Sequence, residues 1–94
     1  MCKKNDKEIN MNFIDFTNNR FQVLCFLYEI CNSDYVAHIT QQEIANKLEM
    51  SRSTINKIMS YLVKEQYICT VNAHVGRYIL TSKAVLLVQG FKNI

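Results

Sequence analysis

Apolar residues recur with helical spacing through the middle of the chain, between residues 39 and 68. Two groups keep the spacing of three or four positions that one helix face requires: Ile44, Ala45 and Leu48, and then Ile55, Ile58, Met59 and Leu62. The pattern therefore predicts two short amphipathic helices, each with a stripe directed towards a core. A break is expected between them at Glu49 and Met50.

Both helices carry start signals in the sequence. Thr40 precedes Glu43 by three residues, which is the spacing of a capping box. Ser51 is a favourable N-cap for the second helix because its hydroxyl can accept a backbone N–H from the first turn. Two short helices joined by a tight turn are typical of a helix-turn-helix, whose second helix enters the DNA major groove.

The second helix has a polar face with three cations and no carboxylate. Together with the cap, this face supplies the candidate DNA-binding residues Ser51, Arg52, Ser53, Asn56, Lys57, Ser60 and Lys64. Asn pairs well with adenine and Arg with guanine, while Ser and Lys suit phosphate. The alternative is that this face is only the solvated side of a helix in a small domain.

A β-hairpin is predicted directly after this helix. Residues 67–71 and Arg77–Leu80 are rich in β-branched and aromatic side chains, and the intervening loop ends at Gly76, where a positive φ is expected. Thr81 is placed to cap a last helix from Ser82 to about Phe91. Such a hairpin resembles a wing, and its candidate DNA contacts are Thr70, Asn72, His74 and Arg77.

Arg77 is the candidate for the minor groove, whose negative potential attracts guanidinium groups. Thr70, Asn72 and His74 are candidates for contacts with the DNA backbone. The alternative for Arg77 is a surface charge that steadies its strand.

The segments SRSTINKIMSYLVKEQYI and YILTSKA resemble the winged helix-turn-helix regulators of bacteria, the MarR-like group in particular. The resemblance covers roughly residues 21–91. It implies a mainly α fold with a small β-hairpin: a three-helix core, a wing at Ile68–Leu80 and a C-terminal helix, with the recognition helix at Ser51–Glu65. It also implies a dimeric transcriptional regulator, a repressor or an activator, on a near-palindromic double-stranded DNA site.

Two positions depart from the pattern of this family. Glu49 and Gln66 stand where glycine is common, at the turn between the two helices and after the recognition helix. A left-handed conformation at a non-glycine residue costs about 1 kcal/mol.

Length and composition fit one small domain. The chain has 94 residues, 49% of them hydrophobic, and a formal net charge of +3, which permits nucleic-acid binding without requiring it. Residues 1–10 are expected to form a flexible arm and residues 11–94 the winged helix-turn-helix domain. Neither a signal peptide nor a transmembrane stretch is recognisable, so a cytoplasmic location is predicted.

The cysteines indicate neither a metal site nor a disulfide. Cys2, Cys25, Cys31 and Cys69 form no C-x-x-C pair, and neither histidine has metal-ligand spacing to them. We expect reduced thiols, no metal and no cofactor, with a thiol redox sensor as the minor alternative. The sequence also has no Gly-rich phosphate loop, paired carboxylates or activated nucleophile, so an enzyme is not expected.

The flanking helices predict a homodimer. Between Phe21 and Cys31 the only polar positions are Gln22 and Glu29, which leaves more apolar circumference than one small core needs. The last helix has an apolar stripe that contains Ala84, Leu87, Val88 and Phe91. Val85 and Leu86 are expected to point away from this stripe. A second copy, with a contribution from Phe13 and Phe16, or the N-terminal segment of the same chain would cover the surplus.

Two other functions use the same fold. One is a winged-helix module that binds protein, for which the aromatic residue Tyr61 is the single hint. The other is a plasmid or phage replication protein, which would use the same DNA chemistry.

Overall fold

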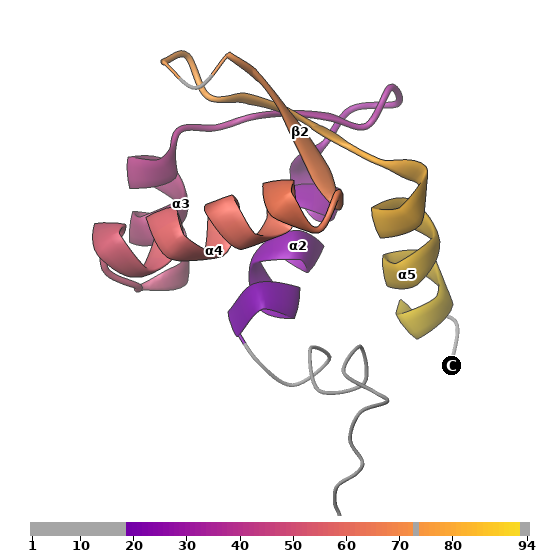
Figure 1. Ribbon diagram of the computed structural model, residues 1–94, viewed down its shortest axis with the longest axis horizontal. Coiled ribbons are helices and arrows are strands. Elements are labelled where there is room, and N and C mark those ends of the chain that lie inside the picture. Colours follow the sequence, from indigo (N-terminus) through magenta and orange to yellow (C-terminus); the bar gives the residue numbers. More distant parts are fainter. Residues whose placement is uncertain (1–18, 73, 93–94) are drawn as a thin grey trace, which may run out of the picture.

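Helices and short strands alternate along the part of the chain described by the computed structural model, residues 19–72 and 74–92. In chain order the elements are α2 (Asn19–Ile30), β1 (Val36–His38), α3 (Gln41–Leu48), α4 (Arg52–Lys64), β2 (Ile68–Asn72), β3 (Arg77–Leu80) and α5 (Ser82–Lys92) (Figure 1). The predicted arm at residues 1–10 lies outside the described residues, as do Cys2, Phe13 and Phe16. The mainly α winged helix-turn-helix fold is confirmed.

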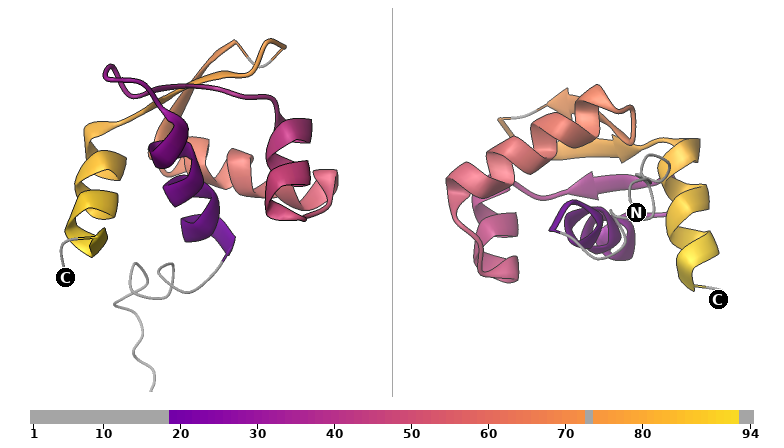
Figure 2. Two further views of the ribbon diagram at one scale, coloured as in Figure 1. Left: turned by 180° about the vertical axis from the view of Figure 1, so that it is seen from behind. Right: turned by 60° about the horizontal axis from the view of Figure 1, so that its bottom comes forward.

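The helices surround a single apolar core. α2 lies between the α3–α4 pair and α5, as two opposite views show (Figures 1 and 2). The largest fully buried side chains come from almost every element: Val23, Leu24, Leu27, Ile44, Ile55, Leu62, Ile68, Tyr78 and Val88. The predicted core stripes of the two central helices are therefore confirmed, with Leu48 only half-buried.

The strands form an antiparallel sheet of order β1-β3-β2, so the predicted hairpin gains a third strand. β1 pairs Val36 with Ile79 and Ala37 with Tyr78. β1 was not predicted, because three residues are too few to show an alternating pattern. The turn before β1 is held by Asn32, whose Oδ1 accepts the backbone N–H of Val36 at 3.1 Å.

The backbone at the element ends follows the predicted signals. Thr40 and Glu43 form the complete capping box, and the Ser51 hydroxyl accepts the backbone N–H of Thr54. Glu49 and Gln66 adopt the left-handed conformation expected where the family has glycine, with φ of 56° and 63°. These two residues allow the chain to reverse sharply between α3 and α4, and again between α4 and the wing.

The distribution of apolar residues on the flanking helices differs from the expectation. α2 buries Phe21, Val23, Leu24 and Leu27, and its remaining apolar side chains are mostly half-buried. On α5, Phe91 keeps its predicted place on the stripe, because its ring packs edge-on against the buried Phe21 ring with centroids 5.0 Å apart. Val85 is buried at 7% exposure, so its predicted position away from the core was wrong. Packing against β1 and α5 as well as α4 covers α2 more completely than the helical period alone suggested.

The capping box gives a prediction about pH. Thr40 donates its backbone N–H to Glu43 Oε1 at 2.9 Å, which is the main reason that the pKa of Glu43 lies below its ordinary value of 4.5. The stabilisation is therefore present above pH 4.5 and lost as the pH falls through the folded-state pKa. Glu43→Gln should be less stable than wild type to urea at pH 7, and the difference should shrink as the solution is acidified below pH 4.5. A difference that is constant with pH would contradict the charged cap.

Candidate nucleic-acid interface

The polar face of α4 is turned to solvent. Its back is buried through Ile55, Ile58, Met59 and Leu62. All seven predicted positions of this region are exposed: Ser51, Arg52, Ser53, Asn56, Lys57, Ser60 and Lys64. The burial of the apolar stripe fixes the rotation of α4 and thereby presents three cations on one outward face.

Two glutamines of α3 contact this face, and neither is among the predicted DNA-binding residues. Gln41 Oε1 accepts from Asn56 Nδ2 at 3.2 Å. Gln42 Oε1 lies 3.5 Å from a guanidinium nitrogen of Arg52, a long hydrogen bond. The available signal was their place in the first turn of α3, which a helix-turn-helix brings beside the recognition helix. Both glutamines orient the side chains that are best suited to reading bases.

A groove separates α4 from the sheet and the wing. One hollow of about 520 Å³ is lined by Thr40, Gln41, Gln42, Arg52, Asn56 and His74. A second hollow of about 300 Å³ is lined by Gln41, Met59, Ser60, Val63, Lys64, Thr70 and Tyr78. Gln41 lines both hollows, so they are adjacent along the helix. The structure thus groups His74 and Thr70 of the wing with the polar face of α4.

Arg77 and Asn72 lie elsewhere on the wing. Asn72 pairs with Arg77 across the hairpin, at the base of the loop, and neither residue lines the two hollows. Asn72 Oδ1 accepts the backbone N–H groups of His74 at 3.0 Å and Val75 at 3.4 Å, so this oxygen shapes the wing loop. Arg77 is exposed, and its assignment to the minor groove stays a prediction.

Gly76 joins the wing to the start of α3. Its φ is +68°, which confirms the expected positive value, and it is buried. Its carbonyl oxygen accepts the backbone N–H of Ile39 at 2.7 Å. Because Ile39 immediately precedes the N-cap Thr40, this contact fixes the wing relative to the helix-turn-helix.

The described cysteines differ in their exposure to solvent. Cys25 and Cys31 are half-buried and Cys69 is exposed. Burial raises the pKa of Cys31, and its Sγ donates to the carbonyl oxygen of Tyr28 at 3.0 Å. A protonated thiol is a weak nucleophile, so Cys31 is poorly suited to redox sensing.

Within residues 19–72 and 74–92 no three His, Cys, Asp or Glu side chains are grouped so that they can hold a metal ion. Over the same ranges every helix is too short or too polar to span a lipid bilayer. The polar face of α4 and the hollows beside it remain the strongest candidate site.

The arrangement of α3, α4 and the β2–β3 wing has counterparts among known proteins. Residues 22–86 match the family model of the Crp-like helix-turn-helix domain. The chain belongs to this family. A search of the curated proteins gave no match.

Several solved structures resemble this Crp-like domain. MepR, a transcription regulator of the Staphylococcus aureus multidrug efflux pump MepA, superposes with a TM-score of 0.69 at 25% identity over 87% of the chain. The reduced CO-sensing protein from R. rubrum gives a TM-score of 0.67 at 25% identity over 84% of the chain. The chain spans 59% of the length of MepR and 41% of the CO sensor. The predicted MarR-like winged helix-turn-helix is thereby confirmed.

MepR in its complex with DNA has the same fold as this domain. It superposes with a TM-score of 0.67 at 22% identity, covering 87% of this chain and 68% of the other.

Proposed function

We propose that the protein binds double-stranded DNA sequence-specifically through α4 and regulates transcription as a repressor in the cytoplasm. The observation that carries this proposal is the outward face of α4, with Arg52, Lys57 and Lys64 exposed above a buried apolar back. A face with three cations and no carboxylate attracts the phosphate backbone and leaves amide and hydroxyl groups to meet base edges. The MepR–DNA complex supports the proposal, because it shows a protein of this fold on DNA.

Each candidate residue has a role that its chemistry suits. Arg52 and Asn56, oriented by the α3 glutamines, would read base edges. Ser53 and Ser60, on the same face, would add to the discrimination between bases. Lys57 and Lys64 would contact phosphates. Ser51 would cap α4, and the wing residues Thr70, Asn72, His74 and Arg77 would contact the flanking backbone and minor groove.

Selection from a random pool of duplexes at a fixed salt concentration tests the proposal. Recovery of a defined motif, bound at least a thousandfold more tightly than random duplex, is expected for a specific regulator. Binding that shows no motif, or no binding at low salt, would contradict it. Placing the selected motif upstream of a reporter gene then distinguishes a repressor from an activator or a replication protein.

We also propose that the protein acts as a homodimer through α2 and α5, on a near-palindromic site. The support is the apolar surface that these helices leave exposed, where Leu86 is 68%, Phe91 42% and Ile30 40% exposed. An isologous dimer would set two copies of α4 about one turn of DNA apart. The selected motif should therefore have two symmetric halves.

Leu86→Lys should shift the protein from dimer to monomer, because it places a charge in the proposed interface. Light scattering at micromolar concentration should give twice the mass of one chain for wild type and a lower mass for the variant. Val71→Lys, at a position that is 50% exposed on the wing, is the matched control and should remain dimeric. A monomeric wild type would contradict the dimer and leave the DNA-binding proposal intact.

A protein-binding function was suggested only by Tyr61, and the structure accounts for that residue differently. Tyr61 is half-buried, and the Arg20 guanidinium carbon lies 4.1 Å from the centre of its ring. The Tyr61 ring therefore already contacts a cation of its own chain, and we do not propose a protein-binding module.

A further inference from the structure

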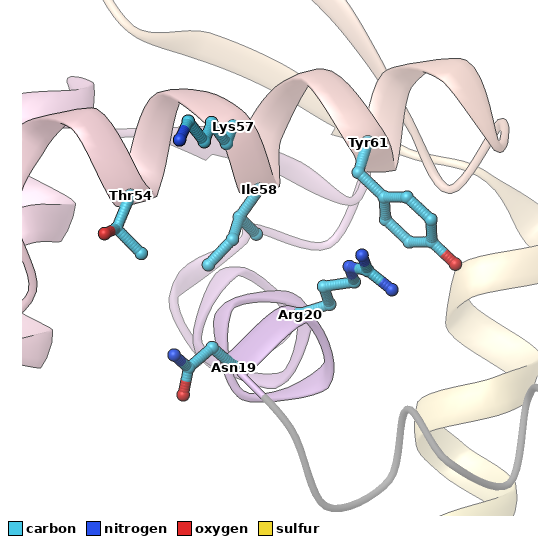
Figure 3. Close-up of a pocket in the computed structure, with 6 residues that line it drawn as sticks. All are labelled: Asn19, Arg20, Thr54, Lys57, Ile58 and Tyr61. Carbon is cyan, nitrogen blue, oxygen red and sulfur yellow. The ribbon is translucent and has the colours of Figure 1, made fainter.

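A third hollow lies on the flank of α4 that faces α2, away from the wing. It has a volume of about 380 Å³ and opens between the first turn of α2 and the middle of α4 (Figure 3). Its lining residues are Asn19, Arg20, Thr54, Lys57, Ile58 and Tyr61. Two of these residues are cations, and none of the lining residues carries a carboxylate.

Both cations reach this hollow from separate elements. Arg20 comes from α2 and Lys57 from α4, and both side chains are exposed. Thr54 adds a hydroxyl that accepts from the Ser51 hydroxyl at 2.8 Å and so keeps its own hydrogen available for donation. Two cations and a hydroxyl donor around one space are a suitable set for an anion.

Tyr61 orients one of these cations. The Arg20 guanidinium carbon is 4.1 Å from the Tyr61 ring centre, which is a cation–π contact. This contact restrains the Arg20 side chain beside α4, where Figure 3 shows it extending towards the Tyr61 ring.

The position of the hollow beside α4 matches the place where a DNA backbone would lie if α4 entered the major groove. The major groove is about 12 Å wide, so a helix inserted into it has one phosphate backbone on each side. On one side of α4 the wing groove holds Arg52 and His74. On the other side the third hollow holds Arg20 and Lys57. A helix seated in the groove would thus have cations facing both strands.

We propose that this hollow binds a backbone phosphate of the DNA strand that faces away from the wing. Arg20 and Lys57 supply the charge, Thr54 supplies a hydrogen bond, and Tyr61 is a positioning residue that holds Arg20 in place. The inference rests on the proposed DNA binding. It extends the contact surface to α2, whereas all the residues predicted from the sequence lie on α4 and the wing.

Salt titration of the full chain on its selected duplex tests the inference. Arg20→Ala should weaken binding evenly across sequences and reduce the slope of log K against log salt by about 0.9, the value for one phosphate. Arg20→Lys should retain most of the slope. Tyr61→Leu should weaken binding while leaving the slope unchanged, because the charge remains.

Lys83→Ala is the matched control. Lys83 Nζ lies 4.3 Å from the centre of the Tyr67 ring, so this variant also removes a cation from a tyrosine, and it does so outside the three hollows. Its slope should equal that of wild type. Melting curves of each variant will show whether a change in binding reflects loss of the fold.

Phosphate ethylation provides a second readout. One phosphate whose ethylation weakens the wild type should cease to matter in Arg20→Ala, and it should lie on the strand away from the wing. An unchanged slope and ethylation pattern in Arg20→Ala would overturn the inference while DNA binding by the wild type stands. If wild type binds no duplex, the proposed function itself fails.

Discussion

Replacing Gly76 with alanine should unfold a large fraction of the protein or displace the wing. At φ +68° a side chain costs about 1–2 kcal/mol. A Cβ at this position would also overlap the carbonyl oxygen of Ile39 and lie 2.6 Å from the backbone nitrogen of Thr40. Relieving such an overlap adds about 1–3 kcal/mol. Urea denaturation should therefore show a loss of several kcal/mol, a sizeable part of the stability of a small domain.

The second glycine of the chain is a matched control. Gly90 lies on α5, and a Cβ added there would meet nothing within 4 Å. Gly90→Ala should stabilise the protein by up to about 1 kcal/mol, because alanine has the higher helix propensity. Equal effects of the two substitutions would show that the Gly76 backbone is not constrained as the structure indicates.

Replacing Asn56 with alanine should remove sequence preference at one base pair of each half-site. The expected loss is about 1–3 kcal/mol for the preferred base, with little change in salt dependence. Arg52→Ala should have an effect of the same size at a different base pair. Quantitative binding to single-base variants of the selected duplex measures both losses. Preference unchanged at every position would show that α4 does not read bases through these side chains.

Lys57→Ala serves as the contrasting variant, because it should weaken all sequences evenly and lower the salt slope. Gln41 provides a further check through a double-mutant cycle with Asn56. Since Gln41 Oε1 accepts from Asn56 Nδ2, the two losses of preference should be non-additive. Additive losses would show that Gln41 does not act through Asn56.

The elements with strong local signals were predictable from the sequence. The capping box at Thr40 and Glu43, the N-cap at Ser51 and the apolar stripe of α4 are local features whose physics needs few distant residues. The wing was predictable from its strand-forming residues and Gly76. β1 was not, because its three residues are strand only by pairing with β3, some forty positions later in the chain.

The candidate site was predictable in part for a similar reason. The helical period places Arg52, Asn56 and Lys57 on one face of α4, so the polar face could be derived from α4 alone. The contributions of Gln41 and Arg20 depend on how α3 and α2 cross α4, which sequence spacing does not specify. The same limit explains Val85, whose burial is decided by the neighbours of α5.

The hydrogen bond from Ile39 to Gly76 has a mechanical consequence. The hairpin is anchored at that point to the residue before Thr40, and β3 is also paired with β1, which contacts α2. Tilting the hairpin would therefore also move α3 and α4. If the protein binds DNA as the proposed homodimer, each chain would contact the duplex as one rigid unit, and the distance between the two units would be the main flexible coordinate.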